Sequence, residues 1–127
     1  MLTVYIHGLR LVSEANAHEH WRKRHQRAKI QKHAASAHLW IAAAGNRPTG
    51  DLVVTITRVA PRMLDSDNAT GSAKHVRDGV ALWLGRDDSV TSGIDWIVRQ
   101  AKGKTYGVEI RIETADEARG SRREEVA

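Results

Sequence analysis

The hydrophobic and polar positions along the chain predict four β-strands. Residues 2–7 alternate between apolar and polar side chains and are rich in β-branched and aromatic types, as in a half-buried strand. Residues 52–59 have the strongest β composition in the chain. Two more strands are expected at 94–100 and 105–113. The short polar segment between these two contains Gly103 and predicts a hairpin.

A long polar helix is expected between the first two strands. It should run from about Glu14 to Ala44, with Ser13 as its N-cap. Its apolar residues are sparse and recur at spacings near four and seven, so one stripe of the helix is expected to face the body of the protein. The residues of this stripe are Ala17, Trp21, Ala28, Ala35, Leu39 and Ala42.

A second helix is expected from about residue 69 to residue 84, after an extended or loop-like segment at 63–68. Asp67 or Asn68 can cap its start, and Gly85 is a typical C-terminal stop. The apolar residues of this helix share one arc, which predicts its core-facing side. They are Ala73, Val76, Val80, Trp83 and Leu84.

The order of these elements is β-α-β-α-β-β, which predicts an α/β (α+β) domain with one mixed β-sheet and helices packed against it. The length of 127 residues fits one domain, placed at residues 1–113. The segment 114–127 is charged and lacks apolar periodicity, which is typical of a flexible tail. There is no cysteine and no apolar run of membrane-spanning length. We therefore expect no membrane partner and a cytoplasmic location.

Positive charge is concentrated in the predicted first helix. The formal net charge is +5, and between Arg10 and Lys32 the only acidic residues are Glu14 and Glu19. Such a basic stretch favours a polyanionic partner such as DNA. The residues expected to contact phosphates are Arg22, Lys23, Arg24, Arg27, Lys29 and Lys32. No Gly-rich phosphate loop is present, so no nucleotide cofactor is expected.

Trp21 lies inside this basic stretch and has two interpretations. It can anchor the helix to the body of the protein, which is the commoner role of such a tryptophan. Alternatively, it can stack on an exposed base at a branch point in DNA. The position in the apolar stripe favours the anchor.

Candidate chemistry lies in a group of aspartates around the second predicted helix. In an extended segment residues i and i+2 point to the same side, so Asp65 and Asp67 are expected to project together. The chain returns at Asp87 and Asp88, and three carboxylates converge if this return comes close. Converging carboxylates need a compensating cation, and their oxygens suit Mg²⁺ or Mn²⁺. Such an ion can activate water for phosphodiester hydrolysis, and Lys74 is the candidate to offset transition-state charge.

Each of these features also has a purely structural interpretation. Acidic residues before a helix are a common helix start. Lys74 and Asp78 are four residues apart and can form a surface ion pair. Asp87 and Asp88 can form a plain turn. The order in which the features occur is what favours catalysis over these alternatives.

That order resembles the RusA family of phage and prophage Holliday-junction endonucleases. The family's Asp-x-Asp-Asn is matched by Asp65-Ser66-Asp67-Asn68, its Lys-x-x-x-Asp by the segment from Lys74 to Asp78, and its Gly and Asp-Asp by Gly85 and Asp87-Asp88. The resemblance covers most of residues 2–113. One departure is that Lys74 lies about one helical turn farther from the first motif than in the family pattern, which leaves other branched DNA open as substrate.

The resemblance implies a homodimer that binds four-way DNA junctions and cuts two strands symmetrically with Mg²⁺. The implied catalytic residues are three metal-binding aspartates and a lysine, namely Asp65, Asp67, Asp88 and Lys74. Supporting positions are Asn68, Asp78 and Asp87. Two other classes of function stay open: a basic DNA-binding module without catalysis, and a structural or regulatory phage protein that acts through protein contacts.

Overall fold

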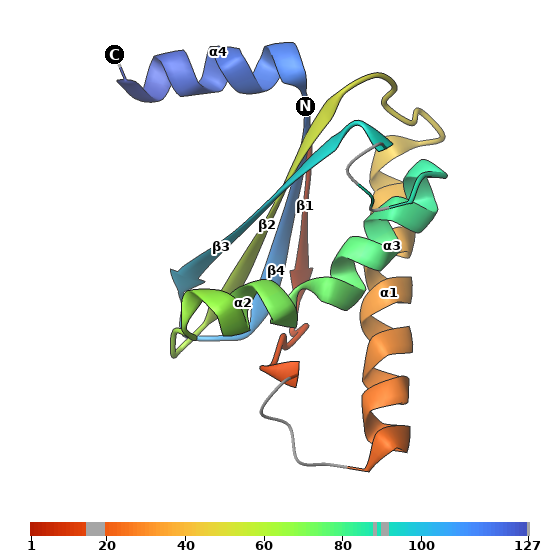
Figure 1. Ribbon diagram of the computed structural model, residues 1–127, viewed down its shortest axis with the longest axis vertical. Coiled ribbons are helices and arrows are strands. Elements are labelled where there is room, and N and C mark those ends of the chain that lie inside the picture. The colour runs from red at the N-terminus through yellow and green to blue at the C-terminus, as the bar shows by residue number, and fades with distance from the viewer. Residues whose placement is uncertain (15–19, 88, 90–91, 127) are drawn as a thin grey trace.

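The computed structural model of the chain describes residues 1–14, 20–87, 89 and 92–126. Its elements in chain order are β1 (Leu2–His7), α1 (Trp21–Ala43), β2 (Leu52–Ala60), α2 (Ser66–Ser72), α3 (Lys74–Leu84), β3 (Ile94–Lys102), β4 (Gly107–Thr114) and α4 (Ala115–Val126). The strands form a single mixed sheet, with helices packed against it (Figure 1). The predicted fold class is confirmed.

The sheet has the strand order β1-β4-β2-β3. β4 is antiparallel to both of its neighbours, whereas β2 and β3 are parallel, with Leu52 opposite Ile94. The predicted hairpin is wrong, because β3 and β4 lie on opposite sides of β2. The connection between them crosses the end of β2, where the Gly103 amide donates to the Ala60 carbonyl at 3.1 Å. A side chain at Gly103 would meet Val59, since an added Cβ would lie 2.6 Å from its Cγ1.

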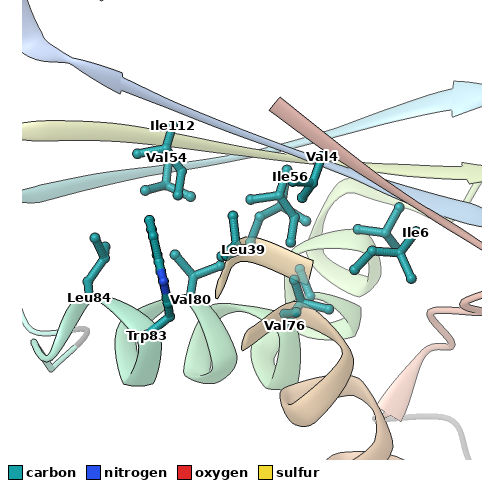
Figure 2. Close-up of a cluster of buried hydrophobic side chains, with 14 of the residues drawn as sticks. Val4, Ile6, Leu39, Val54, Ile56, Val76, Val80, Trp83, Leu84 and Ile112 are labelled. Atoms are coloured by element: carbon teal, nitrogen blue, oxygen red, sulfur yellow. The ribbon is translucent and has the colours of Figure 1, made fainter. Parts of the chain in front are cut away.

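The core lies between the sheet and the helices α1 and α3 (Figure 2). The predicted core side of the second helix is confirmed, because all five of its residues are buried. Trp83 is only 2% exposed and stands between the helix and the strands, with Val54 and Ile112 above it in Figure 2. Residues from β1, β2 and β4 complete the core because alternate residues of each strand point to this face.

Helix α1 begins later than predicted, at Trp21, with His20 rather than Ser13 as its N-cap. The His20 ring accepts a hydrogen bond from the Arg22 amide at 3.2 Å. Trp21 and Ala42 are exposed, so they do not belong to the packed stripe. The buried residues of α1 recur every four positions and are Gln31, Ala35, Leu39 and Ala43. Ala17 of the predicted stripe lies outside the described residues.

The second predicted helix is two helices, α2 and α3, which meet at Ala73. The backbone there (φ −89°, ψ −1°) departs from ideal helix geometry, and the chain changes direction between the two (Figure 1). Helix α2 also starts earlier than predicted, at Ser66, with Asp65 at the N-cap position. The expected caps Asp67 and Asn68 are therefore inside the helix.

A helix occupies the segment predicted to be an irregular tail. A reciprocal pair of hydrogen bonds starts α4: the Glu117 amide donates to the Thr114 hydroxyl at 3.1 Å, and the Thr114 amide donates to the Glu117 carboxylate at 3.2 Å. This Thr-x-x-Glu arrangement is a capping box and is visible in the sequence. The flexibility of this segment stays a prediction. None of the helices formed by the described residues is long and apolar enough to cross a membrane.

Candidate functional site

The acidic motif forms the first turn of α2, just beyond the end of β2. Asp65 accepts a hydrogen bond from the Asn68 side chain, 3.1 Å from Nδ2 to Oδ2, which fixes the orientation of its carboxylate. Asp65 and Asp67 are both exposed. They do not lie on one extended segment as predicted, because Asp67 is helical. Successive residues of a helix are turned by about 100°, so the two side chains leave the backbone in different directions.

Lys74 is the first residue of α3 and is exposed, while Asp78, one turn farther along, is half-buried. No ion pair joins these two side chains. The alternative interpretation of Lys74 and Asp78 as a surface ion pair is therefore wrong. The Lys74 ammonium group is left at the surface of the molecule, where α3 faces the start of α1.

Asp87 lies in the loop after α3 and takes part in a local turn. Its carboxylate accepts hydrogen bonds from the hydroxyl and the amide of Ser89, and these bonds lower the pKa of Asp87. The turn predicted here is thus present at Asp87. Asp88, the third predicted metal ligand, lies outside the described residues.

The parallel crossover from β2 to β3 separates Asp87 from the acidic motif. Asp65 follows the carboxyl end of β2, whereas Asp87 precedes the amino end of β3. Because the two strands are parallel and nine residues long, these ends lie at opposite edges of the sheet, roughly 26 Å of strand apart. Figure 1 shows α2 at one end of the sheet and the end of α3 at the other. Within the described residues, no three Asp, Glu, His or Cys side chains come together as a metal site.

The basic half of α1 lies at the same end of the molecule as the acidic motif. A hollow of about 450 Å³ is formed where the start of α1 meets the start of α3. Its lining residues are Glu14, Trp21, Arg24, His25, Ala28, Lys74 and His75. Trp21 is 65% exposed at this hollow, so its interpretation as the anchor of the helix to the body of the protein is wrong.

An ion-pair network connects the elements that form this hollow. The Arg27 guanidinium donates two hydrogen bonds to the Glu14 carboxylate, at 2.8 and 2.7 Å, and His75 Nε2 lies 3.8 Å from the same carboxylate. These contacts join the loop before α1 to α1 and α3. The hydrogen bonds from Arg27 lower the pKa of Glu14, and partial burial opposes this effect. Arg27 was predicted to contact phosphate, but its guanidinium instead forms an ion pair with Glu14.

The other predicted phosphate contacts are distributed around α1. Lys23 lines a second hollow of about 350 Å³, together with Arg10 and residues of the loop after β1. Arg22, Lys23, Arg24 and Lys29 are exposed, and Lys32 is half-buried. The first turns of α1 therefore present positive charge on several sides. Sequence reasoning did not identify Glu14 and His75 as members of this site, because only the α1–α3 crossing brings them together.

In comparisons with known proteins, no protein-family model, no curated protein and no solved structure matches the chain.

Proposed function

We propose that this chain is a Mg²⁺-dependent endodeoxyribonuclease that acts on branched DNA, with four-way junctions as its substrate and a homodimer as its working form. The observation that carries the proposal is that the Asp65–Asn68 motif, Lys74 and the basic half of α1 share one end of the molecule (Figure 1). This arrangement provides oxygen ligands on α2 and basic residues on α1 in the same half of the molecule. We also propose that the protein is encoded by a phage or prophage and that it acts in the cytoplasm of the bacterial host.

The residues at this end suit magnesium chemistry. Mg²⁺ is commonly held by one or two carboxylates, with substrate phosphate and water completing its coordination, so Asp65 or Asp67 alone can serve as a protein ligand although the two side chains diverge. When bound, Mg²⁺ lowers the pKa of a coordinated water and stabilises charge on phosphate oxygens. Asn68 orients the Asp65 carboxylate. Lys74 supplies a positive charge for the phosphate in the transition state. Mn²⁺ has the same preference for oxygen ligands.

The proposed homodimer also gives a physical role to the second acidic group. Asp87 lies at the end of the molecule opposite the motif at Asp65, and Asp88 follows it in the sequence. In a dimer of suitable symmetry, that end of one chain can meet the motif of the other. Mixed dimers test this: combining Asp65→Asn and Asp88→Asn chains should restore part of the activity that is absent from each variant alone.

The main experiment is cleavage of a labelled four-way junction and a matched duplex, with Mg²⁺ or with EDTA. Paired, Mg²⁺-dependent nicks in the junction are expected, and Asp67→Asn should abolish them while sparing DNA binding. The matched control is Asp95→Asn, which changes an exposed aspartate of β3 outside the motif and should cut normally. Cleavage of other branched DNA instead of the junction would support the assignment as a nuclease and reject the assignment of four-way junctions as its substrate.

A second candidate function is a DNA-binding module without catalysis. It is favoured by the separation of Asp87 from Asp65 across the length of the sheet. In this case the aspartates only start a helix and form a turn. Tight, salt-sensitive DNA binding with no cleavage under Mg²⁺ or Mn²⁺ would select this alternative.

A further inference from the structure

We infer that the hollow between α1 and α3 binds a single unpaired nucleotide of a DNA strand, with its base stacked on Trp21 and its phosphate next to Lys74. This inference rests on the proposed DNA substrate, but it concerns a different part of the surface from the metal ligands. Its residues come from the two helix starts and from the loop before α1.

Trp21 provides an aromatic surface that the fold leaves available. Its side chain is 65% exposed although it is the largest apolar group at the start of α1. The His20 ring lies 5.6 Å from it at 32°, and the Arg22 guanidinium carbon lies 5.6 Å from the ring centroid. Nucleobases stack on such an exposed indole largely independently of sequence, because every base has a π-face.

The charge of the hollow selects an anionic ligand. Among the described residues, the only carboxylate lining it is that of Glu14, which is neutralised by the two hydrogen bonds from Arg27. Lys74 and Arg24 are both exposed and are the two lysine or arginine residues among the described lining residues. His25 and His75 add further hydrogen-bond donors. An aromatic platform beside these cations matches the two parts of a nucleotide, its base and its phosphate.

A second exposed tryptophan on α1 provides an internal comparison. Trp40 is 56% exposed and lines another shallow hollow of about 400 Å³, whose other lining residues all come from α1: His33, Ser36, Ala37 and Ile41. In the part of the chain that the structure describes, no lysine, arginine or acidic residue lines that hollow. Trp40 therefore shares the exposure and the helix of Trp21, and it also has one arginine nearby, Arg47 at 5.6 Å from its ring centroid. Its hollow has no lysine or arginine in the described part of its lining to hold a phosphate, so we expect Trp40 to make no contribution to nucleotide binding.

Fluorescence anisotropy with labelled single-stranded thymidine oligomers of about 12 nucleotides, and with a fully paired duplex of equal charge, tests the inference. Trp21→Ala should weaken single-strand binding by about tenfold or more while changing duplex binding little, because paired bases offer no free face. Trp21→Phe should keep most of the affinity, and Trp40→Ala should bind as the wild type does. The fluorescence of 2-aminopurine in the oligomer should be quenched by the wild type and not by Trp21→Ala.

The possible outcomes separate this inference from the proposed nuclease. Equal losses on duplex and single strand, or quenching that survives in Trp21→Ala, would overturn nucleotide stacking and leave the nuclease standing. Selective loss together with an inactive wild-type enzyme would support the hollow and reject the nuclease. No DNA binding by the wild type at low salt would reject both. If Trp21→Ala proves unfolded by circular dichroism, the variants Trp21→Phe and Trp40→Phe take its place. Stacking is supported if Trp21→Phe fails to quench 2-aminopurine while Trp40→Phe quenches it normally. Stacking is overturned if both variants quench equally and bind with equal affinity.

Discussion

At the scale of single residues, Glu14 shows how one charged group determines the shape of the site. Its side chain is about one-fifth exposed (21%), and its charge is balanced by the bidentate Arg27. A partly buried carboxylate is costly unless such a partner compensates it. The pair therefore fixes the loop before α1 against the helix, and it neutralises the negative charge of Glu14 in the lining of the hollow.

Replacing Glu14 by Gln should lower the free energy of unfolding at pH 7 by about 1–2 kcal/mol, because Arg27 loses its charged partner. The pKa of Glu14 is lowered in the folded state from an ordinary value of 4.5. Its contribution is therefore fully present above that value and is lost as the pH falls through the folded pKa. Urea unfolding of both proteins from pH 7 to pH 3 should show the difference shrinking only below pH 4.5.

Glu109→Gln is the control for this comparison, because Glu109 is also half-buried, lies in β4 and is away from Arg27. It should cost little at pH 7. A Glu14→Gln difference that is unchanged at pH 3 would contradict the assignment of stability to the charged pair.

At the scale of elements, α1 and α3 cross so closely that one position tolerates only glycine. A Cβ added at Gly79 would lie 2.3 Å from the Lys32 carbonyl oxygen and 2.9 Å from the Ala35 Cβ. Backbone atoms cannot move aside as a flexible side chain can. The small pair formed by Gly79 and Ala35 therefore sets the distance between the two helices, and with it the hollow at their starts.

Gly79→Ala should destabilise the fold by about 1–3 kcal/mol, since the strain of overpacking exceeds the gain in helix propensity. Gly71→Ala is the matched control: Gly71 is also helical, and nothing lies within 4 Å of an added Cβ. That change should be neutral or should stabilise by up to about 1 kcal/mol. Thermal unfolding followed by circular dichroism measures both, and equal effects would contradict the close crossing.

At the scale of the whole molecule, the candidate site residues lie at one end and a second group of basic residues lies at the other. The starts of α1, α2 and α3 lie at one end, with the basic stretch and the acidic motif, while α4 and the end of α1 lie at the other (Figure 1). The basic residues of the second end include Arg47, which stacks on Trp40 at 5.6 Å, and Arg119, which pairs with Asp116. We propose that DNA approaches the first end only.

Removing two charges from the first end, in Lys23→Gln/Lys29→Gln, should weaken binding to all DNA shapes. It should also reduce the slope of log affinity against log salt by about one for each phosphate that the protein no longer neutralises. The control Arg47→Gln/Arg119→Gln removes two charges from the other end and leaves the net charge of the two double variants equal. Identical salt slopes for these variants, measured by anisotropy on duplex DNA, would show that only net charge matters.

The sequence by itself determined the strands, the core side of the second helix and its stop at Gly85, because hydrophobic period and local backbone preference act over a few residues. The Thr114–Glu117 capping box could also have been predicted in this way. Tertiary structure alone decided that β3 and β4 flank β2, that Trp21 is exposed, and that Asp65 and Asp87 lie at opposite ends of the sheet. These features depend on strand order and helix crossing, which are set by packing between residues distant in the chain.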